Sequence, residues 1–131
     1  MSDFPFEGEP VIYRYTRRQA LDDGVLVDLT DFSDVEGFLF PVACTAGVYH
    51  RYLLPDKTLE AQGQSLEGRI RDLLVALHAA IKAHGEKSSH VRFQTLFLMP
   101  NRGQVTASFT SICGPDDAGD PVITILLPGE D

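Results

Sequence analysis

One segment near the middle of the chain limits the possible folds more than any other. Ser65 can cap a helix and Gly85 can end it, and the apolar residues between them recur at helical spacing: Leu66, Ile70, Leu73, Leu74, Leu77 and Ile81. A helix from Leu66 to His84 would be about 28 Å long. Three polar residues are expected on its other faces: Arg69, Asp72 and Lys82. Such a helix needs a broad apolar surface to cover.

The last third of the chain supplies that surface. Apolar and polar residues alternate over 91–99 and again over 105–113, whereas 122–127 is apolar at nearly every position. Asn101 and Gly103 lie in a connection of hairpin length between the first two runs. These patterns predict an α+β fold with a three-stranded antiparallel meander in the C-terminal half, packed against one long amphipathic helix.

Shorter elements are predicted before the long helix, and each has a local signal. In chain order they are a helix over 17–23 between Thr16 and Gly24, a short strand over 25–29, a helical turn over 31–36, an extended segment over 38–42 broken by Pro41, a helix from Thr45 to Leu54, and a polar loop over 57–64. The whole chain, 1–131, is of single-domain length, with residues 1–10 predicted to form a loose N-terminal arm.

The composition argues against several functions. The chain has 131 residues, of which 44% are hydrophobic, so it can form a core without disulfides. Its 19 acidic and 11 basic residues give a net charge of -8, which opposes direct binding to nucleic acid. Cys44 and Cys113 match no metal or redox spacing, so we expect free thiols. Neither a signal peptide nor a membrane-spanning apolar run is evident, which predicts a cytoplasmic protein.

No residue pattern assigns a catalytic residue, a metal site or a cofactor. His78 and His84 would be about 120° apart on the predicted helix and would not share a face. Residues 116–120 resemble a calcium loop in composition but lack its bidentate glutamate, so we predict a plain turn. Cys113 stands at a strand end, where a thiol can be exposed. We expect no pocket to bring this thiol within hydrogen-bonding reach of a histidine.

Acidic residues are segregated along the chain. Residues 22–36 hold six carboxylates and residues 103–131 hold five, and neither stretch contains a lysine or arginine. Nine of these carboxylates are candidate partner-binding residues: Asp22, Asp23, Asp28, Asp31, Asp34, Glu36, Asp116, Asp117 and Asp120. We expect at least one group of them to form a continuous anionic patch without an interposed base, which would attract a protein with a basic surface.

Several longer strings are familiar in combination. They are Ile12–Ala20, Asp23–Asp28, Gly37–Phe38, Phe40–Ala43, Cys113–Pro115, Gly119–Ile125 and Leu127–Asp131. Through them the chain resembles a family of small uncharacterised proteins carried by bacterial plasmids, integrative elements and phages. It departs from that family at Tyr49, Arg71 and Val75, near which the family tends to place tryptophans. The resemblance implies a bacterial host cell and a role as an accessory protein, often directed against host defence.

Two hypotheses of different class follow. The first is a non-enzymatic accessory protein of a mobile genetic element, an inhibitor of the anti-restriction or anti-CRISPR type that binds a basic nucleic-acid-processing partner through its acidic surface. The alternative is a small enzyme of unknown reaction that uses Cys113 or a histidine. We favour the first, because no residue spacing meets the geometric requirements of an active site. The sequence does not predict the oligomeric state.

Overall fold

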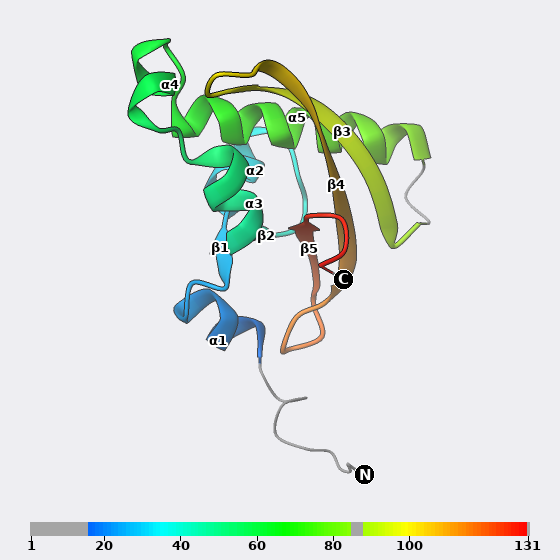
Figure 1. Ribbon diagram of the computed structural model, residues 1–131. Helices are drawn as coiled ribbons and strands as arrows, with labels where there is room; N and C mark the ends of the chain where they lie inside the picture. The colour runs from blue at the N-terminus through cyan, green and yellow to red at the C-terminus, as the bar shows by residue number, and fades with distance from the viewer. Residues whose placement is uncertain (1–15, 85–87, 131) are drawn as a thin grey trace.

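A computed structural model of the chain describes residues 16–84 and 88–130, and the elements within these ranges form an α+β fold (Figure 1). In these ranges there are five α-helices, one π-helical segment and a five-stranded mixed sheet. The predicted arm at residues 1–10 and the predicted helix stop at Gly85 lie outside the described residues.

The sheet is wider than the predicted meander. Its strand order is β1–β2–β5–β4–β3, with these bounds: β1 Leu26–Asp28, β2 Val42–Thr45, β3 His90–Met99, β4 Gly103–Pro115 and β5 Pro121–Leu126. The antiparallel run β3–β4–β5 is the meander that the sequence predicts. The meander is one part of this sheet, because β2 pairs in parallel with β5 and carries β1, which lies within the short strand predicted over 25–29, as an antiparallel edge strand. The N-terminal half therefore completes the sheet.

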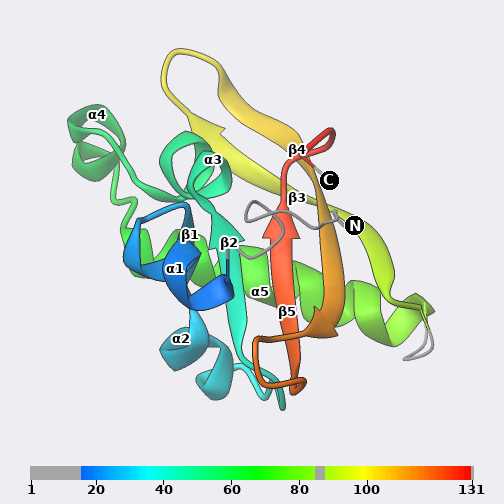
Figure 2. The same ribbon diagram turned by 90° about the horizontal axis from the view of Figure 1, so that it is seen from below.

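The long helix α5 (Leu66–His84) covers one face of the sheet, as its apolar spacing predicts (Figure 2). The Ser65 side chain accepts a hydrogen bond from the Gly68 N–H at 3.0 Å and caps the first turn. Leu73, Leu74 and Leu77 are 0% exposed and pack against the apolar side chains of the sheet. Burial of this stripe is what holds the helix on the sheet.

Arg69 lies inside this interface, so the expectation that it faces away from the sheet is wrong. Its side chain is 1% exposed and donates to the carbonyls of Tyr52 and Leu98, at 2.8 and 2.9 Å, and to Gln64 Oε1 at 3.0 Å. Its guanidinium carbon also lies 4.8 Å from the centre of the Phe97 ring. A buried arginine is tolerated here because neighbouring acceptors satisfy its donors. Burial still lowers its pKa from the usual value.

Four short helices and the π-helical segment join the strands. They are α1 Arg17–Asp22, α2 Thr30–Val35, α3 Ala46–Val48, the π-helical segment Tyr49–Leu53 and α4 Lys57–Ala61. Thr16 and Thr45 cap α1 and α3 as the sequence predicts. The prediction of a polar loop over 57–64 is wrong for its first half, where the Asp56 carboxylate accepts from the Leu59 N–H and starts α4. This cap is a local signal, and Leu59 is the one buried residue of that helix.

Candidate functional site

Charged residues of α1 and of the loop between β4 and β5 meet on the face of the sheet opposite α5 (Figure 2). There α1 packs beside β1, in front of the strands in Figure 2, whereas α5 crosses behind them. The loop between β4 and β5 reaches the start of this helix. One Asp117 carboxylate oxygen accepts from the Arg17 N–H at 2.9 Å and the other from the Arg18 N–H at 3.0 Å. A carboxylate from the far end of the chain thus satisfies two free backbone donors of the first turn.

Arg17 is the centre of this arrangement. Its guanidinium donates to Thr124 Oγ1 at 2.7 Å and to the Ile123 carbonyl at 3.2 Å, and so lies along β5. Burial lowers the pKa of Arg17, and the carboxylates of Asp28, Asp116 and Asp117 act in the opposite direction. Asp28 belongs to the first acidic stretch and the other two belong to the second. Arg17 therefore brings the two acidic stretches together, although about ninety residues separate them.

We call this region the acidic end and define it by six carboxylates and two arginines: Asp22, Asp23, Asp28, Asp116, Asp117, Asp120, Arg17 and Arg18. With six carboxylates and two arginines, negative charge is in excess there by definition of the region. The two arginines lie among the carboxylates, so the expected patch without an interposed base does not form at this end. Arg18 is exposed and pairs with Asp22, with 3.7 Å between Nε and Oδ2. Of the two arginines, only Arg17 is partly buried, with its guanidinium against β5.

Some carboxylates of the acidic end also hold the local backbone. Asp116 Oδ1 accepts from the N–H groups of Ala118 and Asp120, both at 2.9 Å, and closes the predicted turn. Asp28 Oδ1 accepts from the Thr30 N–H at 2.9 Å, next to the start of α2. These oxygens are already engaged by backbone donors. The side chains of Asp22 and Asp120 are exposed, and Asp22 is paired with Arg18.

The remaining three candidate carboxylates belong to another part of the surface. Asp31 and Asp34 are exposed on α2, which packs beside α5. Glu36 follows α2 and pairs with Arg71 of α5, with 3.4 Å between Oε2 and Nε. The structure thus divides the nine predicted residues into two groups, six at the acidic end and three near α2.

The candidate nucleophile Cys113 borders a groove that His78 also lines. This groove lies between α5, the segment 37–40 and the ends of the strands, and its volume is about 350 Å³. Within the described ranges, no hydrogen bond joins the Cys113 thiol to a histidine. The other cysteine, Cys44, is fully buried, and burial raises its pKa to about 12.

The other histidines lie apart from this groove. His50 is exposed and its ring contacts Tyr49 edge-on, while His90 Nδ1 lies 3.1 Å from Ser89 Oγ. His84 is exposed at the end of α5. Among the residues that the structure describes, no three His, Cys, Asp or Glu side chains gather closely enough to hold a metal ion.

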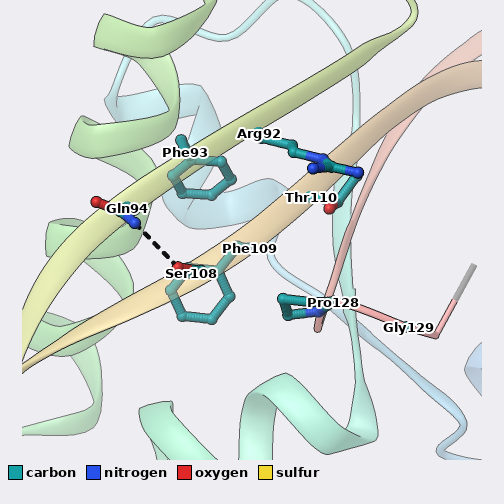
Figure 3. A pocket seen from close by; sticks show the side chains of 8 residues that line it. All are labelled: Arg92, Phe93, Gln94, Ser108, Phe109, Thr110, Pro128 and Gly129. Atoms are coloured by element: carbon teal, nitrogen blue, oxygen red, sulfur yellow. Dashed lines mark hydrogen bonds between the residues drawn. The ribbon is translucent and has the colours of Figure 1, made fainter.

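A larger hollow, of about 600 Å³, lies on the outer side of the β3–β4 hairpin beside Pro128 and Gly129 (Figure 3). Gln94 donates to Ser108 Oγ at 3.2 Å across the two strands. Arg92 is the one charged side chain among those that line the hollow. A single arginine with neutral polar neighbours offers neither an acid–base pair nor a metal site.

Fold and charge together define a small α+β protein with an anionic end on one face of its sheet and an apolar groove on the other. A family of unknown function, DUF6573, matches residues 1–131, and the chain belongs to this family. Searches of curated proteins and of solved structures found no significant match. Among the described helices, none combines the length and the apolar character that crossing a membrane requires.

Proposed function

We propose that this chain is a non-enzymatic binding protein whose acidic end docks on a basic protein surface. The observation that carries the proposal is the convergence of both acidic stretches around Arg17. Arg17 and Arg18 are the two positive charges among the six carboxylates of the acidic end, so they neutralise it only in part. The excess negative charge is presented by exposed carboxylates where α1 ends, Asp22 and Asp23, and in the β4–β5 loop, Asp117 and Asp120. Such a surface speeds association with a partner of opposite charge.

The partner would be a basic, nucleic-acid-processing protein of the bacterial host. Two arguments support a partner of this kind. Proteins that bind nucleic acid need cationic surfaces, and the chain resembles accessory proteins of plasmids, integrative elements and phages. The protein would then act as an anti-defence inhibitor, of the anti-restriction or anti-CRISPR type, that occupies the cationic surface. Its own net charge of -8 argues against direct nucleic-acid binding.

The test begins with capture of partners from a host that carries defence systems, followed by mass spectrometry and association kinetics over a range of salt. Replacing Asp22 and Asp120 by lysine should slow association and reduce its dependence on salt, since exposed charges are screened over about 8 Å at physiological ionic strength. A variant with Asp31 and Asp34 replaced by lysine carries the same change in net charge and should have the smaller effect. Equal, salt-independent rates for all three proteins would refute the proposal.

A second candidate function is catalysis by a thiol, because His78 and Cys113 border the same groove. An imidazole that activates a thiol must approach it within hydrogen-bonding distance when substrate is bound. Cys113 should then react with iodoacetamide faster than a cysteine thiol that is free in solution. His78→Gln should remove this difference in reaction rate. A reaction rate that does not change with His78→Gln rules out this second candidate.

A further inference from the structure

The groove described above lies between the helix layer and the sheet layer. Val91, Ile123 and Cys113, from β3, β5 and β4, line its sheet side. Ile81 and His78 line its helix side, and the His78 ring lies 5.3 Å from the ring of Phe38. The groove is therefore a gap in the packing between α5 and the sheet, with mainly apolar walls.

The walls of the groove are held by backbone hydrogen bonds. The Ile123 N–H donates to the Pro41 carbonyl at 2.9 Å, which fixes the segment 37–40 against β5. The Cys113 N–H donates to the Ser89 carbonyl at 2.8 Å, which fixes the opposite wall against β4. A groove held in this way is largely formed before a ligand arrives, and such preorganisation reduces the cost of binding.

Apolar side chains remain uncovered at the rim. Leu39 is 93% exposed and Phe40 is 38% exposed, in a segment that already places Phe38 against α5. Large apolar side chains exposed together commonly mark a binding site. A ligand with an apolar body would cover this surface and fill the gap behind it.

The charge of the groove differs from that of the protein. Among the described residues that line it, Lys82 is the one charged side chain and none is Asp or Glu. Lys82 lies four residues after His78, so the two side chains are neighbours on one face of α5. Glu36, just before the segment, pairs with Arg71. In a protein of net charge -8, the groove thus offers an ammonium group and an imidazole at the mouth of an apolar gap.

We propose that this groove binds a small apolar monocarboxylic acid. The carboxylate would lie at the mouth, where Lys82 and His78 can donate hydrogen bonds to it. The apolar body would lie between Ile81 and the strand ends. The volume of about 350 Å³ is at the lower end of the range for small-molecule sites, about 300–1,000 Å³, and suits a ligand of this size rather than a larger cofactor. This site lies on the opposite side of the sheet from the acidic end and does not depend on the function proposed for that end.

The test uses the full chain and three probes with the same eight-carbon body: octanoate, octan-1-ol and octylamine. Binding is followed by the backbone amide resonances during titration. Octanoate should bind about tenfold more tightly than octan-1-ol, because a charge-assisted hydrogen bond is worth roughly this ratio, and octylamine should bind most weakly. The shifted amides should be those of 37–40 and 78–82.

Variants then identify the charge that selects the ligand. Lys82→Met should lower the affinity for octanoate about tenfold and leave that for octan-1-ol unchanged, and Lys82→Arg should keep the preference for octanoate. Lys57→Met, on α4, is the matched control and should change neither affinity. Equal binding of the three probes, no binding at millimolar concentration, or shifts around Arg92 instead of this groove would each overturn the proposal.

Discussion

Neighbouring arginines on α1 give a matched test of how the acidic end is held together. Arg17 and Arg18 both lie in the first turn, and replacing either by methionine changes the net charge equally. Arg17 makes two hydrogen bonds to β5 and lies among three carboxylates. Arg18 has one ion pair of 3.7 Å, with Asp22, and its side chain is 81% exposed. The two substitutions should therefore differ in cost, although they are adjacent.

The expected costs follow from these contacts. Hydrogen bonds from a charged donor contribute about 1.5–3 kcal/mol each when buried, and we halve this because Arg17 is only partly buried. Arg17→Met should thus lower the free energy of unfolding by about 2 kcal/mol, whereas Arg18→Met should lower it by at most about 0.5 kcal/mol. Urea denaturation at pH 7 measures both. Repeating it in about 1 M salt should recover part of the Arg17 loss, because repulsion between the uncovered carboxylates is then screened. Equal losses for the two variants would refute this account of the acidic end.

Two further predictions concern the core. Leu77→Ala should lower the free energy of unfolding by about 2–5 kcal/mol in urea denaturation, through lost burial and a residual cavity; a loss below about 1 kcal/mol would contradict the packing of α5. Burial raises the pKa of Cys44 from 9.0 to about 12, so between these pH values the unfolded chain releases a proton that the folded protein retains. Stability should fall over this window, at up to about 1.4 kcal/mol per pH unit from this thiol, and Cys44→Ala should remove that part of the slope. An unchanged slope would show that Cys44 ionises in the folded protein.

Elements with strong local signals are those that the sequence predicts correctly. The helix α5 follows from an apolar stripe of more than four turns, Leu66 to Ile81, with a serine cap, and α1 follows from Thr16 before it and Gly24 after it. The β3–β4 turn follows from Asn101 and Gly103, whose φ values of 61° and 67° suit those residue types. In each case the information lies within a few residues of the element itself.

The missed features depend on contacts that are distant in sequence. Strand β2 has four residues and follows Pro41, so nothing local indicates that it pairs in parallel with β5 at the centre of the sheet. Arg69 is buried because carbonyls from two other elements meet it, and its own helix gives no sign of this. A polar residue on the margin of an apolar helical stripe can be buried when such acceptors converge on it.

The candidate sites show the same limit. Nine carboxylates could be named from charge segregation, but their division into two groups depends on how α1 and α2 pack on opposite sides of the sheet. The role of Arg17 is not evident in the sequence, because it precedes the first acidic stretch and its partners on β5 are more than a hundred residues away.

Strand β5 shows how so small a protein could carry the two recognition surfaces that we propose. At Ile123 the carbonyl accepts from Arg17 of the acidic end, whereas the side chain lines the groove. Strand β5 pairs with β2 on one edge and with β4 on the other, so it is a central strand of the sheet. The two surfaces lie on its opposite faces. Salt should weaken attraction to the acidic end far more than burial of an apolar ligand in the groove. Successive side chains along one strand point to opposite faces of the sheet. The two proposed surfaces are therefore separate and could meet different partners.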